Sequence, residues 1–323
     1  MNKRVFGRTN WNISEIGYGG WGIGRNWWGS TDDQESSKSL NLAWDKGINF
    51  FDTAYVYGDG HSEELMGQVL KGKAAIIATK IPPKNDEWPG NPKTPLKEVF
   101  PADWIKSCTE RSLKKLKRDY LDLTQLHVWS DAWLNQDEWK TTVEQLKKSG
   151  KIKAFGVSIN DHDPDSALQL VSSGLIDSVQ VIFNIFDQSP TKNLFPLCEK
   201  HKVAVIVRVP FDEGGLTGTL NLETKFEKGD FRAQYFQGDH LKQTVERVEK
   251  LKEFLNPDTP LMTDLALKFI LAHKAVSAVI PGMRKSQHVE KNVAVSSQKL
   301  LLDKTLEQLK NHAWQRNFYG WWN

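Results

Sequence analysis

The feature that most constrains this chain is a regular alternation between short apolar runs and longer segments of helical periodicity. The apolar runs, which predict strands, cover residues 16–19, 49–52, 74–79, 120–126, 154–158, 178–182, 203–208 and 277–280. The segments that follow them predict helices at about 33–46, 61–70, 102–117, 138–149, 164–173, 193–200, 241–255 with 261–273, and 287–294. Strands that alternate with helices form a parallel sheet, because each parallel connection needs a crossover.

Eight such units in 323 residues predict an α/β fold, a closed (β/α)8 TIM barrel. The alternative is an open, doubly wound sheet with a nucleotide-binding half. No linker rich in Pro, Gly or Ser divides the chain, so we expect a single domain over residues 1–323. Two additions are predicted, an N-terminal hairpin over residues 3–14 and an extra C-terminal helix over residues 303–314.

Composition and charge exclude several classes of function. The 43 basic and 40 acidic residues are interspersed and form no basic stripe, so we expect no nucleic-acid partner. No apolar run is long enough for a bilayer and no signal peptide is recognisable, so we expect a cytoplasmic protein with no membrane partner. Cys108 and Cys198 are too few for a disulfide framework or a Cys-based zinc site, and we expect no metal. Nothing in the sequence indicates an oligomeric state.

A glycine-rich run near the N-terminus matches the pattern G-x-G-x-x-G over residues 17–22. In a dinucleotide-binding fold, a helix begins at the last glycine of this pattern and presents its N-terminus to the pyrophosphate. Here two more glycines and a pair of tryptophans follow, which is not the start of a helix. We therefore interpret these glycines as positions where the backbone runs close to a ligand.

Three predicted loops are long, at residues 20–31, 81–101 and 209–240, and all follow strands. In a barrel they would share the C-terminal face, where barrel active sites lie. Of the 13 tryptophans, Trp21, Trp27, Trp28 and Trp88 lie in these loops, Trp129 and Trp133 follow the fourth strand, and Trp321 and Trp322 stand in the tail. We interpret the four loop tryptophans and Trp129 as walls of a substrate pocket. The alternative is that they are structural caps on the barrel.

Four polar residues stand at or just beyond neighbouring strand ends: Asp52, Tyr57, Lys80 and His127. Each alone could be a loop cap, a solvated strand end or a buried histidine. Together they could converge at one barrel mouth. A lysine beside a tyrosine lowers the tyrosine pKa, and a carboxylate would hold that lysine in place. Such a tyrosine can act as general acid to a carbonyl oxygen, which the histidine could orient.

These motifs resemble those of the aldo-keto reductase family over nearly the whole chain. The resemblance rests on the segments 51–58, 62–63, 78–80, 119–127, 150–158 and 280–282. It implies the barrel predicted above, with NAD(P)H extended across the C-terminal face without a Rossmann domain. It also implies that Tyr57 protonates the carbonyl as the nicotinamide delivers hydride. Lys80, paired with Asp52, would lower the pKa of Tyr57, and His127 would position the substrate oxygen.

The resemblance also implies a cofactor site. Ser158 and Gln180 would hold the nicotinamide carboxamide, and Phe183 would stack on the ring where the family commonly has tyrosine. Family members often have asparagine directly after the serine, whereas here Ile159 intervenes before Asn160. The remaining cofactor-binding residues implied are Gly20, Trp21, Asp52, Asn160, Pro210, Phe211, Gly214, Leu216, Gly218, Gly282, Arg284, His288 and Asn292.

The expected cofactor is NADPH, with NADH also possible. Arg284 is the expected ligand of the adenosine 2′-phosphate, because a guanidinium can bind a phosphate in bidentate geometry. The alternative interpretation of that segment is a solvated basic turn. The glycine-rich stretch 209–218 could cradle the pyrophosphate with backbone N–H groups, or be an ordinary surface loop.

The predicted function is an NAD(P)H-dependent oxidoreductase that reduces aldehydes or ketones, with a small-molecule carbonyl substrate as partner. The alternative is a cofactor-binding sensor or accessory subunit on the same fold, with little turnover. A barrel lyase that uses Lys80 as a Schiff-base amine is a third possibility. A lysine paired with Asp52 would be protonated and a poor nucleophile, which argues against it.

Overall fold

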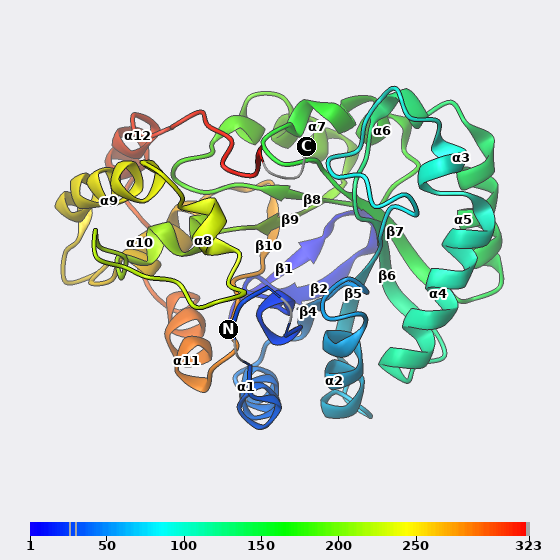
Figure 1. Cartoon of the computed structure of the whole chain (residues 1–323), viewed down its shortest axis with the longest axis horizontal. Helices are drawn as coiled ribbons and strands as arrows, with labels where there is room; N and C mark the ends of the chain where they lie inside the picture. Colours follow the sequence, from blue (N-terminus) through cyan, green and yellow to red (C-terminus); the bar gives the residue numbers. More distant parts are fainter. Residues whose placement is uncertain (26, 30, 321–323) are drawn as a thin grey trace.

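The sheet at the centre of the molecule is parallel, and strands that follow each other in the sequence lie side by side (Figure 1). The computed structural model describes residues 1–25, 27–29 and 31–320. In that part of the chain the eight strands are β3 (Tyr18–Gly19), β4 (Phe50–Asp52), β5 (Ile76–Ile81), β6 (Leu121–Leu126), β7 (Ile152–Ser158), β8 (Ser178–Ile182), β9 (Ala204–Arg208) and β10 (Val276–Val279).

The two edges of this sheet meet. Parallel bridges join Ile16 to Val279 and Gly19 to Gly282, and the backbone N–H of Gly17 donates to the Val279 carbonyl at 2.8 Å. A closed sheet has no open edge. The predicted (β/α)8 barrel is therefore confirmed, and the doubly wound alternative is wrong.

Helices surround the barrel and begin or end within a few residues of the predicted bounds. The surrounding helices are α1 (Asp33–Asp45), α2 (His61–Val69), α4 (Ala102–Leu116), α5 (Asp137–Lys148), α6 (Leu168–Ser173), α7 (Leu194–His201), α10 (Met262–Leu271) and α11 (Ser286–Val295). Helix α4 shows why they form: Ile105, Cys108, Ser112 and Leu116 recur at helical spacing and are buried. The helix ends at Lys117, which adopts left-handed backbone angles.

The predicted N-terminal hairpin over residues 3–14 is present, and it closes the end of the barrel opposite the carboxyl ends of the strands. It consists of β1 (Lys3–Phe6) and β2 (Trp11–Ser14), which pair antiparallel. Phe6 packs against Phe50 inside the barrel, with ring centroids 5.5 Å apart. At Gly7 a Cβ atom would lie 2.7 Å from the backbone nitrogen of Ala204, so only glycine lets the hairpin approach this closely. With this end plugged, the mouth at the carboxyl ends of the strands is the accessible one.

Four further helices lie in the loops and near the C-terminus: α3 (Leu96–Val99), α8 (Arg232–Tyr235), α9 (His240–Leu251) and α12 (Asp303–Lys310). The extra C-terminal helix is confirmed but ends at Lys310, not at Trp314. The chain then crosses from α12 towards the middle of the barrel (Figure 1). Trp321 and Trp322 lie outside the described residues. Within the described ranges, no helix is both long and apolar enough to cross a membrane.

Candidate active site

Alternation along the barrel strands decides which side chains reach the mouth, because successive residues face opposite sides of the sheet. An apolar layer fills the lower barrel and consists of Phe6, Ile13, Phe50, Ala78, Leu123, Ala154, Ala204, Ile206, Ala278 and Ile280. Asp52, Lys80 and Arg208 each stand two residues beyond a member of this layer. His127 stands four residues beyond another. All four side chains therefore face the upper end of the barrel.

Tyr57 reaches the same place through a tight turn after β4. Its backbone N–H donates to the Ala54 carbonyl at 3.1 Å. Gly58 has a φ of 69°, and a Cβ there would lie 1.9 Å from the carbonyl oxygen of Gly24. Glycine at position 58 is therefore required for the loop after β3 to pack against this turn. That packing fixes where the Tyr57 ring points.

The ammonium group of Lys80 contacts two of the predicted partners, Asp52 and Tyr57, and one backbone carbonyl. Its Nζ atom lies 2.6 Å from Oδ1 of Asp52, 2.8 Å from the Thr53 carbonyl and 3.3 Å from the Tyr57 hydroxyl. An ammonium has three donors, and each has an acceptor here. The other carboxylate oxygen of Asp52 accepts from Nε2 of Gln180 at 2.8 Å. Lys80 is therefore held in one orientation, with its charge against the Tyr57 hydroxyl.

Burial and neighbouring charges shift the pKa values of Tyr57 and Lys80 in opposite directions. Burial raises the pKa of Tyr57, and the positive charge of Lys80 works against that rise without cancelling it. The predicted lowering of the Tyr57 pKa by Lys80 is thus only one of several effects, and burial is the largest. For Lys80, burial works to lower the pKa, but the charges of Asp52 and Tyr57 raise it overall. At neutral pH the lysine is charged and the Tyr57 hydroxyl keeps its proton.

His127 stays neutral at the same pH. Burial, with the nearby charges of Lys80 and Arg208, holds the pKa of its imidazole well below the ordinary value. Its ring meets that of Tyr57 edge to face, with centroids 6.0 Å apart. The Nδ1 atom is buried without a hydrogen-bond partner among the described residues. A neutral ring can donate a hydrogen bond to a substrate oxygen without competing with Tyr57 for the proton.

Aromatic side chains gather around Tyr57 and His127. Trp21 stacks on Tyr57 at a centroid distance of 6.1 Å, and Trp88 meets His127 edge to face at 4.7 Å. Trp28 contacts Trp21 at 5.2 Å, and Phe231 lies 4.8 Å from Trp21. Of the predicted pocket tryptophans, Trp21 and Trp88 thus contact the polar cluster directly, and Trp28 packs against Trp21. Sequence reasoning missed Phe231, which comes from the long loop after β9.

Trp27 occupies a different environment from its neighbours. Its side chain is 39% exposed, and its backbone carbonyl accepts a hydrogen bond from Phe231 at 3.0 Å. The loop after β3 and the loop after β9 are therefore joined by their backbones at the mouth. The assignment of Trp27 to the substrate pocket stays a prediction.

The strands on the opposite side of the mouth carry the residues expected at the nicotinamide. Ser158 and Gln180 are paired in register on β7 and β8. Asn160 bonds through its side-chain amide to both the backbone nitrogen and the carbonyl of Gly90, at 3.0 and 3.1 Å. Asn160 thus ties down the loop after β5. Arg208, which sequence reasoning missed, donates to the Ile159 carbonyl at 2.9 Å and faces the mouth at the end of β9.

The glycine-rich loop after β9 carries Pro210, Phe211, Gly214, Leu216 and Gly218, all expected near the cofactor. It contains the 3-10 helix η6 (Asp212–Thr217), with positive φ at Val209, Asp212 and Glu213. Leu216 is fully buried, so only its backbone could reach a ligand.

The C-terminal segment holds this loop from above. Arg316 pairs with the Asp212 carboxylate, and the Tyr319 hydroxyl donates to Glu213. Burial raises the pKa of Glu213 to about 8, so this carboxyl carries a proton at neutral pH. The contact joins residues more than 100 positions apart, and no local pattern predicts it.

Near the start of α11, the expected adenosine-binding residues lie on one segment. Arg284 donates through Nη1 to the Trp28 carbonyl at 2.7 Å, and burial lowers its pKa. Gly282 leaves open space where a side chain would stand, and Asn292 is buried with its Nδ2 atom unpartnered among the described residues. Burial also lowers the pKa of His288.

Comparison with known proteins decides the family. A family model described as "Aldo/keto reductase family" matches residues 15–313. The chain belongs to the aldo/keto reductase family. It is 30% identical to an uncharacterized oxidoreductase, YqkF, of Bacillus subtilis, a match that covers 98% of this chain and 97% of that protein. It is 28% identical to an NADH-specific methylglyoxal reductase of Escherichia coli, covering 91% of this chain and 93% of the relative.

Solved aldo-keto reductase structures share the fold. The glycerol dehydrogenase AKR11B4 of Gluconobacter oxydans superposes with a TM-score of 0.78 at 27% identity, covering 96% of this chain and 94% of that chain. The aldo-keto reductase AKR11C1 of Bacillus halodurans, in its holo form, gives a TM-score of 0.76 at 26% identity, covering 97% of this chain and 96% of that chain.

One residue predicted from the aldo-keto reductase resemblance points away from the mouth. The fully buried ring of Phe183 packs against Phe195 and His273, each with a centroid distance of 4.9 Å. Because Gln180 faces inward, a residue three positions later faces the surrounding helices. The prediction that Phe183 stacks on the nicotinamide is therefore wrong.

Trp129 is a second correction. Its indole is fully buried and packs edge to face on Trp133 and Trp139, at 5.9 and 5.3 Å. Its Nε1 atom donates to Asp131 at 3.0 Å. These contacts place it between the barrel and helix α5, so it does not line the substrate pocket. For this tryptophan the alternative of a structural role is correct.

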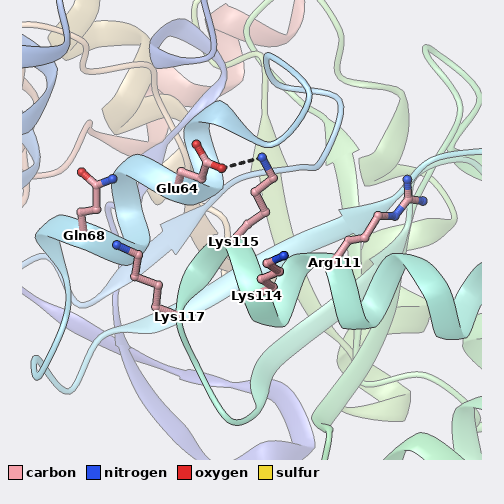
Figure 2. A pocket seen from close by; sticks show the side chains of 6 residues that line it. All are labelled: Glu64, Gln68, Arg111, Lys114, Lys115 and Lys117. Carbon is pink, nitrogen blue, oxygen red and sulfur yellow. Dashed lines mark hydrogen bonds and ion pairs between the residues drawn. The ribbon is translucent and has the colours of Figure 1, made fainter.

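A cavity of about 570 Å³ lies between α2 and α4 on the outer side of the barrel, and its lining includes no member of the tetrad formed by Asp52, Tyr57, Lys80 and His127 (Figure 2). It is lined by Glu64, Gln68, Arg111, Lys114, Lys115 and Lys117. Lys115 pairs with Glu64 at 2.5 Å, and Arg111 lies over the ring of Tyr55. Three of the lining side chains, Glu64, Lys115 and Arg111, are thus engaged in these contacts.

Proposed function

We propose that this chain is an NAD(P)H-dependent carbonyl reductase that converts aldehydes or ketones to alcohols. The observation that carries the proposal is the contact of the Lys80 ammonium with the Tyr57 hydroxyl, backed by the buried Asp52 carboxylate. The family resemblance adds the cofactor, and the relatives named above include an oxidoreductase that uses NADH.

The residues present fit a nicotinamide dinucleotide. Gly282 leaves room for a ligand, and the orphaned amide of Asn292 offers a donor near α11. Ser158 and Gln180 are paired in register at the mouth, on the neighbouring strands β7 and β8. When bound, the cofactor supplies a hydride to the carbonyl carbon.

The chain's own residues would then handle the proton and the substrate. Tyr57 holds a proton at its hydroxyl and gives it to the carbonyl oxygen. Lys80 stabilises the phenolate that remains, and Asp52 keeps the lysine in place. The neutral His127 orients the oxygen, while Trp21 and Trp88 exclude water from the reacting centre.

The direct test is a panel of carbonyls and alcohols assayed with NADPH and NADH by absorbance at the nicotinamide band. We expect turnover of simple aromatic aldehydes. A cofactor-binding sensor on the same fold would bind nucleotide without turning over any member of the panel. Borohydride reduction of a Schiff base that leaves substrate covalently attached to Lys80 would instead revive the lyase alternative.

Substrate ranking should depend on the tryptophans that face the tetrad. Trp21→Ala and Trp88→Ala each remove an aromatic wall beside Tyr57 or His127. For a ring-bearing substrate this loss is worth about 1–3 kcal/mol in kcat/KM relative to a small aldehyde. Trp44→Ala, on the outer helix α1, is the matched control and should keep the wild-type ranking. An unchanged ranking in both pocket variants would make these tryptophans structural caps.

Arg284 should contribute to binding of the 2′-phosphate that distinguishes NADPH from NADH. A charge-assisted contact of this kind is worth about 1.5–3 kcal/mol, or roughly tenfold or more in Kd. We expect Arg284→Ala to raise the Kd for NADPH by that factor and to leave NADH nearly unchanged in a fluorescence titration. Added salt should reduce the difference. Equal weakening of both cofactors would show that Arg284 only supports the Trp28 loop.

A further inference from the structure

An acidic side chain from another helix lies at the start of α11, where Arg284 would meet a phosphate. Glu35, in the first turn of α1, accepts a hydrogen bond from the backbone N–H of Ser286 at 2.9 Å. The same oxygen accepts from the Ser286 hydroxyl at 3.0 Å. Helices α1 and α11 lie side by side, so this contact is part of their packing (Figure 1).

The contact identifies an anion position that the chain fills with its own carboxylate. The first backbone N–H groups of a helix have no partner within the helix, and they attract negative charge. Glu35 is partly exposed and stays ionised, since the hydrogen bonds from Ser286 lower its pKa. Both hydrogen-bond donors of Ser286 are thus bonded to the Glu35 carboxylate, which is negatively charged as a phosphate is.

We propose that Glu35 is a specificity-determining residue that opposes binding of an adenosine 2′-phosphate at the N-terminus of α11. This inference rests on the proposed function, which places a nicotinamide dinucleotide across this face. A 2′-phosphate entering beside Arg284 would meet the Glu35 carboxylate and would find the Ser286 donors occupied. A ribose 2′-hydroxyl can instead donate a hydrogen bond to that carboxylate. Arg284 and Glu35 therefore act in opposite directions on the choice between NADPH and NADH.

A second observation indicates that a nucleotide belongs on this segment. Asn292 lies on α11 and is 4% exposed, and its Nδ2 atom has no partner among the described residues. A buried amide left without an acceptor is costly, and an acceptor on a bound base would satisfy it. Helix α11, whose first residue Glu35 contacts, therefore carries a polar group six residues further on whose hydrogen-bonding requirement is unfilled among the described residues.

The test uses small fragments, so that it does not depend on catalysis. Binding of 2′,5′-ADP and of 5′-AMP to the full chain is measured by isothermal titration calorimetry at low salt. Glu35→Gln keeps an oxygen acceptor for Ser286 and removes only the charge. We expect this variant to bind 2′,5′-ADP about tenfold more tightly, with 5′-AMP changed by less than about threefold. Arg284→Ala should instead weaken the binding of 2′,5′-ADP relative to that of 5′-AMP.

Glu290→Gln is the matched control, since it makes the same charge change on α11 without touching Ser286. It should alter neither affinity by more than about twofold. An unchanged ratio in Glu35→Gln, with both fragments still binding, would overturn the proposal and leave the reductase intact. If neither fragment and neither cofactor binds to any variant, the proposed reductase function fails together with the proposed role of Glu35. Equal tightening of both fragments would assign Glu35 a general electrostatic role and would also overturn the proposal.

Discussion

Replacing Tyr57 by phenylalanine is expected to lower kcat for carbonyl reduction by about 10²–10⁴-fold, the usual contribution of a positioned general acid. The substitution keeps the ring that stacks on Trp21 and removes only the hydroxyl that contacts Lys80. Because the substitution alters no residue expected to hold the cofactor, the Kd of the cofactor should change little. Stopped-flow and steady-state absorbance measurements report the rate, and tryptophan fluorescence reports the binding.

Tyr55→Phe is the matched control for this loss. Tyr55 is two residues away on the same turn, but its ring lies under the Arg111 guanidinium, 4.5 Å from the ring centroid, rather than at the tetrad. The Tyr55 variant should retain nearly all activity. Near-normal turnover in a folded Tyr57→Phe protein would remove Tyr57 from the mechanism, whatever the effect of the control.

The fold and the position of the tetrad could be predicted because both follow from local patterns. Eight strand-helix units specify the barrel, and residues at the ends of adjacent parallel strands must meet at one mouth. Lys80 and His127 are examples, since their strands β5 and β6 are neighbours in the sheet. The same reasoning could have corrected one error. Counting outward from the inward-facing Gln180 places Phe183 against the helices.

Other features of the site depend on contacts that no local pattern records. Trp129 follows a strand just as the pocket tryptophans do, yet it turns down onto Trp133 and Trp139 because a buried aromatic cluster is available there. The contact of Tyr319 with Glu213 joins residues from distant parts of the chain. In the sequence, Glu35 is an ordinary acidic residue in the first turn of a predicted helix. Its contact with Ser286 depends on the packing of α1 against α11, which the sequence does not show.

Removing the charge of Lys80 tests how the proton at Tyr57 is controlled. Lys80→Met has a similar length but no ammonium. Lys80 works against the rise that burial causes in the Tyr57 pKa, so its loss should raise that pKa further. A single opposite charge is worth about 1–3 pKa units. Each unit removes a factor of about ten from the phenolate present at neutral pH.

Alcohol oxidation, which needs the phenolate as base, should therefore lose about 10–1,000-fold at pH 7–8 in Lys80→Met and recover as the pH rises. Carbonyl reduction, which needs the protonated hydroxyl, should lose less. Because the variant leaves Asp52 buried without its cation, at a cost of about 3–5 kcal/mol, the double variant Lys80→Met/Asp52→Asn is measured alongside. Both variants lack the ammonium beside Tyr57, so both should show an oxidation profile displaced to higher pH. The displacement should be smaller in the double variant, because the Asp52 charge that it also removes raises the Tyr57 pKa, by less than Lys80 lowers it. A profile that keeps the wild-type midpoint in the folded double variant would mean that Lys80 only positions Asp52 and Tyr57 and does not set the proton affinity of the tyrosine.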